Sequence, residues 1–331
     1  MRQSAFIFLF FVSTFGFAST EDSLRFQLHG LIDGYSVVGK SNSIGKIPYL
    51  VSSSNLNSFQ INLNLMEFTW ENSKWKYALS PALGTYMSQN YAAEKKYKRW
   101  IYEVYVQRKF NKSSLAAGVF SSPYTQETPK SIDQISYSRS LAPEYVPYYI
   151  SGLKYNRTIN SKWSLSLFAM NGWQKMDYAN FTPSFGSLLE FKRDRWKFNW
   201  STYLGRETTI QAKEPQTRIF SEWNVQYAYR KWMFQSCFFV GTQGINFSRN
   251  WGQLNGQFAY SLSDRIRLYG RVEYFMDPSN IQIARKQLAS ESLGVLYAIN
   301  DVMNIGTEFR CFHSEKKAFE PYQFLFFQLK F

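Results

Sequence analysis

Apolar and polar residues alternate along many short segments of this 331-residue chain, and this period of two constrains its fold more than any other feature. Segments such as 219–227 and 266–274 place apolar side chains on one face and polar side chains on the other, as a β-strand does. No segment of comparable length has the 3.6-residue period of a helix. After residue 20 there is also no block of about 20 apolar residues, which excludes a helical membrane protein. The alternation therefore predicts an all-β fold.

Two kinds of polar connection separate the alternating segments. Seven are short turns and eight are longer loops, so that fifteen connections predict sixteen strands of about 10–14 residues. The turns lie at 72–74, 111–113, 160–162, 193–195, 230–231, 263–265 and 300–301, and the loops at about 39–56, 89–98, 123–147, 175–182, 207–217, 246–250, 278–287 and 314–320.

This pattern is typical of a closed antiparallel transmembrane β-barrel in the outer membrane of a Gram-negative bacterium. We expect a single domain over residues 19–331, with the short turns in the periplasm and the long loops outside. Tryptophan directly follows four of the short turns, as an aromatic girdle at one membrane level requires. A soluble sandwich with tryptophans in its core does not explain this placement. The four residues are Trp75, Trp163, Trp196 and Trp232.

The first 18 residues have the features of a cleaved signal peptide. A short basic start precedes the apolar stretch 5–17, and Gly16-Phe17-Ala18 is a small-x-small cleavage site. The alternative is an N-terminal anchor helix. Cleavage after Ala18 would remove one basic residue and leave 37 basic against 24 acidic residues, a net charge of +13.

The charge and the cysteines exclude two further classes. The basic residues are scattered and follow an export signal, which argues against nucleic acid and favours lipopolysaccharide phosphates or anionic solutes as partners. Two cysteines are too few for a disulfide framework in an exported chain of this length. Cys237 and Cys311 fall on non-adjacent predicted strands, so we expect two free, buried thiols.

The C-terminal segment 322–331 alternates up to a terminal aromatic residue, with Leu325, Phe327, Leu329 and Phe331 on one face. This ending resembles the terminal-strand signal that the barrel assembly machinery reads in outer-membrane barrels. We therefore assign Phe331, Leu329 and Phe327 to that signal.

Charged residues on the strands are expected to face the lumen, because an Arg or Lys facing lipid near the midplane costs about 2–4 kcal/mol. In a hydrated lumen these charges either pair across strands or set the field that selects ions. The residues assigned to the lumen are Glu103, Gln107, Arg267, Arg271, Glu273, Glu308 and Arg310.

Residues 123–147 form the longest predicted loop, and four prolines stiffen it. Loops of this length are usually functional or disordered. We expect this one to fold inward as a constriction; the alternative is a loop that stands outward. Its charged residues are Lys130, Asp133, Arg139 and Glu144.

Catalysis is not expected. Only His29 and His313 could serve a Ser-His-acid set, and the chain has no Gly-x-Ser-x-Gly sequence, metal-spaced His/Cys cluster or Gly-rich phosphate loop. We therefore predict no enzyme, no cofactor and no metal.

Short motifs recur along the chain in a fixed order. Residues 118–127 read Gly-x-aromatic-x-x-Pro-x-x-x-Glu, 138–140 read Ser-Arg-Ser, 147–152 read Pro-Tyr-x-x-x-Gly, 171–173 read Asn-Gly-Trp, and 271–278 read Arg-x-Glu-Tyr-x-x-Asp-Pro. In this order the motifs resemble those of the OmpL-like β-barrel porin family. The resemblance implies a passive outer-membrane porin and names no substrate.

The sequence therefore predicts a water-filled pore for passive diffusion of small hydrophilic solutes. Membrane lipids are expected to surround the barrel. Both a monomer and a homo-oligomer are compatible with the sequence. The alternative is a structural or adhesive barrel with a closed lumen and partner-binding external loops. Because the lumen charges are near balance, the basic excess is placed at the mouths and predicts a weak anion preference that fades with salt. The mouth residues are Lys95, Lys96, Lys98, Arg99, Lys316 and Lys317 in loops, and Lys74, Lys112 and Lys162 in turns.

Overall fold

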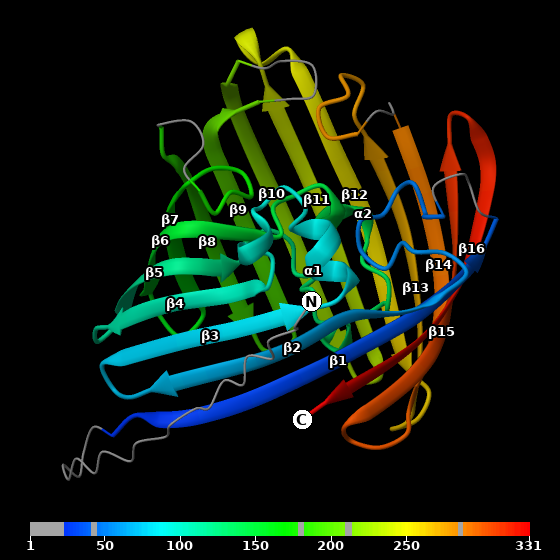
Figure 1. Cartoon of the computed structure of the whole chain (residues 1–331), viewed down its shortest axis with the longest axis horizontal. Coiled ribbons are helices and arrows are strands. Elements are labelled where there is room, and N and C mark those ends of the chain that lie inside the picture. The colour runs from blue at the N-terminus through cyan, green and yellow to red at the C-terminus, as the bar shows by residue number, and fades with distance from the viewer. Residues whose placement is uncertain (1–22, 41–44, 178–181, 209–213, 284–286) are drawn as a thin grey trace, which may run out of the picture.

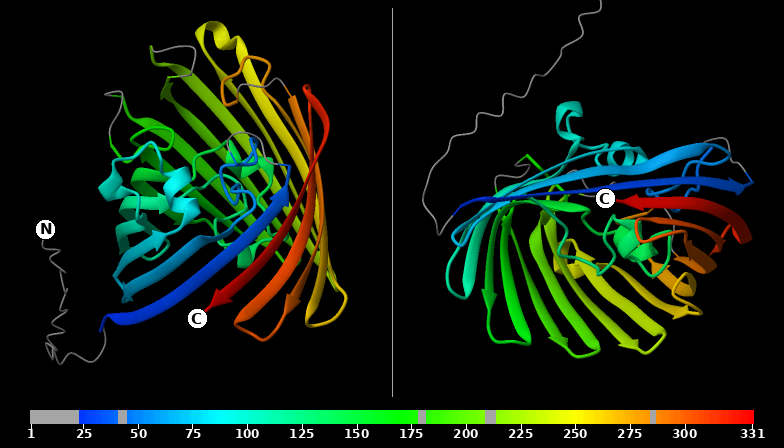
Figure 2. Two further views of the ribbon diagram at one scale, coloured as in Figure 1. Left: turned by 45° about the vertical axis from the view of Figure 1, so that its right-hand side comes forward. Right: turned by 90° about the horizontal axis from the view of Figure 1, so that it is seen from below.

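Sixteen antiparallel strands close into one barrel, in which each strand pairs with its neighbours in sequence and β1 pairs with β16 (Figure 1 and Figure 2). The computed structural model describes residues 23–40, 45–177, 182–208, 214–283 and 287–331, so the predicted signal peptide lies outside the described residues. The strands are β1 (Arg25–Gly39), β2 (Phe59–Glu71), β3 (Trp75–Leu83), β4 (Ile101–Lys109), β5 (Ser113–Ser121), β6 (Tyr149–Thr158), β7 (Trp163–Met170), β8 (Ser184–Arg193), β9 (Trp196–Glu207), β10 (Gln216–Tyr229), β11 (Trp232–Gln243), β12 (Arg249–Ser261), β13 (Ile266–Met276), β14 (Gln287–Ala298), β15 (Met303–Ser314) and β16 (Lys317–Lys330).

The helices of the described residues are short and lie in loops at one end of the barrel or inside it. They are α1 (Thr85–Asn90), η1 (Lys96–Lys98), η2 (Ser131–Asp133), α2 (Leu141–Glu144) and η3 (Ile245–Phe247). Within the described ranges, no helix has the length and apolar character needed to cross a membrane.

The predicted strand number is confirmed, and turns and loops alternate except at the last connection; two loop predictions are corrected. Segment 314–320 is a tight turn at residues 315–316, because β16 begins at Lys317 and pairs with Ser314. The charged residues of segment 314–320 predicted a loop. In the structure, charged residues of this segment belong to strand β16 of the hairpin. Segment 89–98 is longer, covering 84–100, because it contains α1 and η1. We call the two ends of the barrel the short-turn end and the long-loop end.

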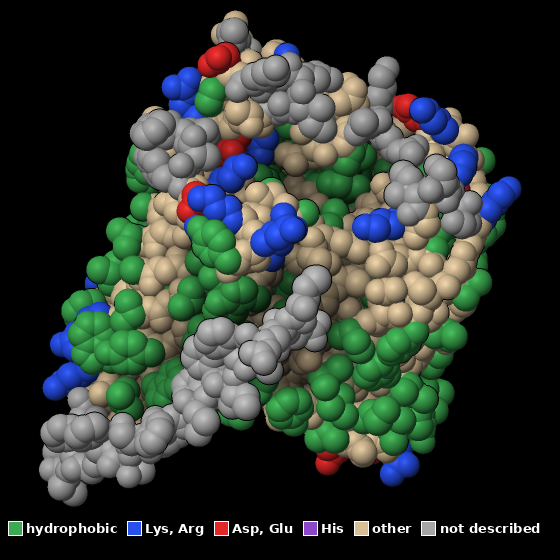
Figure 3. Space-filling model, in the orientation of Figure 1, with side chains coloured by type: hydrophobic (Ala, Val, Ile, Leu, Met, Phe, Trp, Pro, Cys, Tyr) green, Lys and Arg blue, Asp and Glu red, His purple; other side chains and the backbone are tan. Residues whose placement is uncertain are grey.

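The period of two separates a lumen face from an outer face on each strand. On β10, Phe220 and Glu222 point inward and are 1% and 0% exposed, whereas Ile219 and Val225 point outward and are 38% and 36% exposed. On the side shown in Figure 3, hydrophobic side chains cover the outside of the strands. An apolar band around the outside is what a lipid-embedded barrel requires.

The four tryptophans after short turns begin their strands, and three of them pack on an aromatic residue of the next strand, whereas Trp75 lies against Arg108. Trp196 lies opposite Tyr227, with ring centroids 4.4 Å apart, and Trp232 lies opposite Tyr260 at 4.6 Å. Both tryptophans are largely exposed on the outer face. Aromatic pairs of this kind stabilise strand pairing by up to about 1 kcal/mol. The tryptophans predicted to form the girdle therefore lie at the short-turn end of the barrel.

The C-terminal residue closes the barrel. The amide and carbonyl of Phe331 pair with those of Gly30 at 3.1 and 2.8 Å, and the Phe331 ring lies where a side chain on residue 30 would project. Leu325 and Phe331 are exposed on the outer face, while the alternate residues Phe324 and Phe326 are buried.

Deleting Phe331 should therefore lower the amount of folded barrel in the membrane severalfold, because the closing hydrogen bonds and the proposed assembly signal are lost together. Heat-modifiable migration on gels measures the folded fraction. Phe319→Ala, which removes an exposed aromatic residue from the same strand, is the matched control. Normal levels of folded Phe331-deleted protein would contradict the prediction.

Candidate functional site

Residues 123–147, which connect β5 to β6, lie inside the barrel, and we call them the inserted loop (Figure 2). The structure therefore places this loop where the sequence analysis expected it, and a role as the constriction stays a prediction. Near its two bases, Gly118 and Gly152 lie opposite each other with φ of 145° and 147°. A Cβ atom at either position would come within 2.1 Å of a backbone oxygen of the neighbouring strand, so only glycine fits there.

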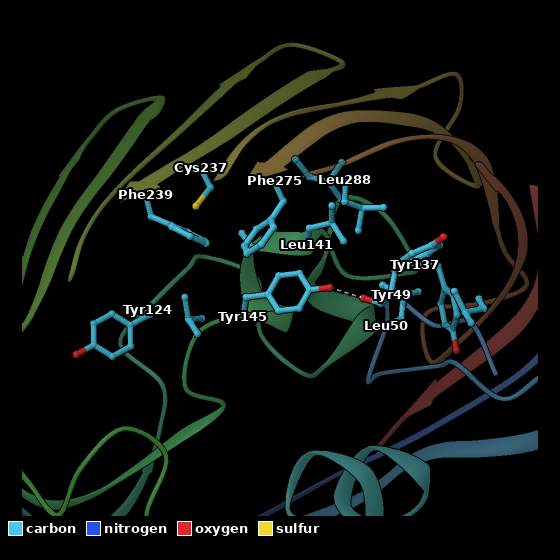
Figure 4. Close-up of a cluster of buried hydrophobic side chains, with 14 of the residues drawn as sticks. Tyr49, Leu50, Tyr124, Tyr137, Leu141, Tyr145, Cys237, Phe239, Phe275 and Leu288 are labelled. Carbon is cyan, nitrogen blue, oxygen red and sulfur yellow. Dashed lines mark hydrogen bonds between the residues drawn. The ribbon is translucent and has the colours of Figure 1, made fainter. Parts of the chain in front are cut away.

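Apolar side chains of the inserted loop pack against the inner face of β10–β16. In Figure 4, Leu141 and Tyr145 of the loop lie next to Phe275 and Phe239 of the wall. The Tyr145 and Phe275 rings are 4.4 Å apart. The loop therefore has a hydrophobic core of its own inside the barrel, on one side of the lumen.

Four charged residues that the sequence assigned to the lumen lie under the inserted loop. Arg271, Glu273, Glu308 and Arg310 point inward as predicted, and their side chains are 0% exposed. Glu273 lies 2.7 Å from Arg310 and 3.1 Å from Arg271, and Arg271 lies 3.5 Å from Glu308. Two positive and two negative charges thus form a neutral buried cluster, which we call the charge clamp.

The charge clamp holds the backbone of the inserted loop. Arg271 donates to the Ser138 carbonyl at 2.6 Å, and Glu308 accepts the Ser138 amide at 3.0 Å. Glu273 accepts the Leu141 amide at 2.5 Å. Because these charges are paired and buried beneath the loop, they hold the loop in place and do not line an open part of the lumen.

The inserted loop also reaches the β1–β2–β16 side of the barrel. Lys130 pairs with Glu67 of β2 at 2.7 Å, and the Tyr137 hydroxyl donates to Asp33 of β1 at 3.0 Å. Asp133 is exposed and lines a pocket of about 330 Å³ at the short-turn end. Two of the four charged loop residues named from the sequence therefore lie at this end.

Arg139 and Glu144 lie at the opposite end of the inserted loop, among other loops. Glu144 accepts the backbone amides of Val51 and Ser52 at 2.6 and 3.1 Å, which ties the first long loop down. Arg139 stacks on the Tyr148 ring with its guanidinium carbon 5.2 Å from the ring centre. Both residues are buried, so they fix the loop and leave the lumen surface to others.

The remaining wall, on β3–β9, keeps charged side chains that are at least partly exposed. Glu103 and Gln107 are among them, as predicted, and Glu103 accepts the Ser121 amide at 2.8 Å. Sequence reasoning missed five inward lysines here, although Lys76 and Lys197 each directly follow an outward tryptophan and must face the other way. The wall carries the lysines Lys76, Lys109, Lys154, Lys192 and Lys197 against the partly exposed glutamates Glu103 and Glu190, with Glu71 beside it at the end of β2.

The lysines of this wall lie mostly toward the short-turn end. Lys192 and Lys197 are directly opposite each other on β8 and β9, while Lys76 and Lys109 both lie beside Glu71. The remaining predicted lumen residue, Arg267, is partly exposed on β13 and donates to the Gln134 carbonyl at 3.2 Å. The sequence predicted that the basic excess lies at the mouths of the pore. In the structure, part of it lies on the wall of the barrel.

At the long-loop end, two of the predicted mouth lysines share one carboxylate. Lys98 hydrogen-bonds to Asp177 and Lys95 lies 3.4 Å from it. The hydrogen bond from Lys98 is the main cause that holds the pKa of the Asp177 carboxyl below its usual value. The pair is exposed to water, so its charge is screened by salt.

The two histidines do not meet. His29 points inward at the short-turn end and lines the same 330 Å³ pocket as Asp133, whereas His313 is on the outer face of β15. Cys237 and Cys311 are free and buried, on β11 and β15, as expected.

Comparison with known proteins identifies the fold and the family. The barrel resembles OmpF of Salmonella typhi (TM-score 0.69, 11% identity, covering 93% of this chain and 98% of that one). It also resembles an anion-selective porin from Comamonas acidovorans (0.65, 7%, 93% and 100%) and the trimer form of OmpT, an outer membrane protein of Vibrio cholerae (0.63, 9%, 94% and 100%). No curated protein sequence matches the chain. The family model described as "Putative beta-barrel porin-2, OmpL-like" matches residues 25–323, and the chain therefore belongs to this family of outer-membrane porins.

Proposed function

We propose that this porin passes small hydrophilic solutes by passive diffusion, with a weak preference for anions. The observation that carries the proposal is the contrast between the two sides of the lumen. On β13 and β15 four inward charges are clamped under the inserted loop, whereas on β3–β9 and the adjoining end of β2 five lysines face three partly exposed glutamates. The surplus of two positive charges attracts anions to that wall.

The likeness to a porin described as anion-selective agrees with this reading, although it concerns the fold alone. The family and the fold support a non-enzymatic channel, and the proposed transport needs no covalent step or cofactor. Self-association is a further proposal, supported by the trimer form of the similar OmpT. Exposed apolar side chains on the outer face and lysines in the loops would contact lipid and lipopolysaccharide phosphates.

Replacing Lys154, Lys192 and Lys197 together by glutamate should reverse the preference from anions to cations in dilute salt, because the wall changes from a surplus of two positive charges to four negative. The reversal potential across a planar bilayer under a KCl gradient measures this. The control is the triple change Lys95/Lys96/Lys98→Glu, which alters the total charge equally, but at an exposed loop.

The two variants are compared also at about 0.15 M salt, where charges are screened beyond about 8 Å, and there the control, whose lysines lie at the mouth, should shift the reversal potential less. A strong cation preference of the unaltered protein in dilute salt would contradict the anion proposal. Equal shifts from both triple variants would place the selecting field at the mouth, as the sequence analysis assumed.

One observation favours the second candidate, a closed barrel whose loops bind a partner. The inserted loop contacts the wall from β9, where the Tyr124 hydroxyl donates to the Thr202 carbonyl at 3.2 Å, through the charge clamp to β2, where Lys130 pairs with Glu67. Planar-bilayer recordings separate the candidates. Discrete conductance steps from folded protein support the pore, and their absence from a well-folded sample favours the closed barrel.

A further inference from the structure

Three potential metal ligands meet on the outer face of the barrel, near the long-loop ends of β14 and β15. Glu291, Cys311 and His313 place a carboxylate oxygen, a sulfur and an imidazole nitrogen within 4.8 Å of one another. Glu291 lies opposite Cys311 in the strand pairing, and its neighbour Leu293 on the same outer face is 64% exposed. The chain has only two histidines and two cysteines, and one of each is here.

The hydrogen bonds of His313 show that this cluster needs a positive charge. Its Nδ1 bonds to the Ala318 carbonyl, which can only accept, so Nδ1 carries a hydrogen. Its Nε2 lies 2.8 Å from both carboxylate oxygens of Glu291. In a neutral ring, the Nε2 lone pair would therefore face the lone pairs of a carboxylate. Either a proton or a metal cation must lie between them.

We propose that Glu291, Cys311 and His313 bind a zinc ion, with the fourth position left to water. Imidazole, thiolate and carboxylate are the ligands that Zn²⁺ takes, and three protein ligands with one open position is a known arrangement. A metal-binding histidine usually donates its other ring hydrogen to a carbonyl or carboxylate, as His313 does to Ala318.

Zinc binding leaves the local charge unchanged. Without metal, a protonated His313 balances Glu291 and the Cys311 thiol is neutral. With Zn²⁺ bound, neutral imidazole, carboxylate and thiolate sum with the ion to zero, and the Nε2 and thiol protons pass to water. Neutrality matters because the surrounding outer face is apolar: Val272 and Phe319 are 66% and 61% exposed. The ion would reach the site from outside the barrel, so the proposal is independent of whether the lumen conducts.

The test uses the folded full-length barrel in detergent, stripped with a chelator and titrated with Zn²⁺ by calorimetry. Co²⁺ serves as a spectroscopic substitute, because a cysteine thiolate bound to it gives an intense charge-transfer band. We expect one ion per chain. Cys311→Ser should abolish the band, and it should weaken zinc binding by about tenfold or more, since even the loss of a second-shell partner weakens metal sites by such a factor.

The chain provides matched controls in its other cysteine and histidine. Cys237→Ser and His29→Gln should leave zinc binding unchanged, whereas His313→Gln and Glu291→Gln should weaken it as Cys311→Ser does. Heat-modifiable migration establishes that each variant is folded. If one of the three ligand variants fails to fold, the other two still test the site. Equal binding by ligand and control variants, or no binding of Zn²⁺ by the unaltered protein, would overturn the proposal.

Discussion

Replacing residues 126–144 by a short Gly-Ser linker is expected to raise the single-channel conductance severalfold. The inserted loop fills the side of the lumen along β10–β16, where its tyrosines and leucine pack on the wall (Figure 4). A sixteen-stranded barrel leaves an aqueous channel unless something occupies it. Removing the loop should therefore widen the narrowest cross-section.

Recordings in planar bilayers at high salt measure this effect with little influence from fixed charge. The matched control replaces residues 246–248 in the loop between β11 and β12, which is exposed at the long-loop end. That change should leave the conductance unaltered. An unchanged conductance after removal of residues 126–144 would show that the narrowest point lies elsewhere, for example where the first long loop meets Tyr145.

The barrel itself could be predicted from local sequence features. Strand alternation is visible over a few residues, and turn chemistry marks the boundaries, so strand number and facing follow without long-range information. The failure at 314–320 has the same origin. A run of Glu and Lys suggests a loop, but a hairpin can extend beyond the membrane, where charged strand residues meet water.

The inserted loop could be predicted to enter the lumen, but not which wall it would cover. That choice depends on contacts between residues more than 130 positions apart, such as Ser138 with Arg271 and Arg310. Charges on β13 and β15 therefore suggested a pore lining, although the loop buries them. The lysines of β3–β9 were missed although local information was sufficient. Their strands are short, but an inward direction follows for Lys76 and Lys197 from the outward tryptophan that precedes each of them.

The motifs behind the family resemblance converge on the inserted loop. Glu127 accepts the Ser140 amide at 3.0 Å, and Ser138 lies between the two arginines of the charge clamp. Glu273, from the motif at 271–278, accepts the Leu141 amide. The motifs therefore encode the attachment of the loop, which explains why they imply a porin without naming a substrate.

Arg310→Met is expected to lower the free energy of unfolding by about 3–5 kcal/mol, the usual effect of removing one partner from a buried ion pair. Arg310 donates to Ser290 at 3.0 Å, to Ser138 at 3.1 Å, to the Arg139 carbonyl at 2.9 Å and to Glu273 at 2.7 Å. Methionine keeps much of the volume, so the loss reflects charge and hydrogen bonds. Urea unfolding in lipid vesicles, followed by tryptophan fluorescence, measures it.

Arg267→Met is the control, because that arginine is only partly buried and its single contact with the loop is the Gln134 carbonyl. A hydrogen bond of this kind contributes about 1 kcal/mol. If both substitutions destabilise the barrel equally, the clamp contributes no more than an ordinary contact.

Because the charge clamp is neutral, removing one of its negative charges should compensate in part for the loss of Arg310. Arg310→Met leaves Arg271 with two carboxylates, a net charge of −1 at side chains that are buried from solvent. Adding Glu273→Gln restores neutrality, keeps an oxygen that can accept the Leu141 amide, and leaves Arg271 paired with Glu308. The double variant should therefore lose less stability than the two single losses added together, by more than about 1 kcal/mol. Simple additivity would show that Arg310 and Glu273 stabilise the barrel independently of each other.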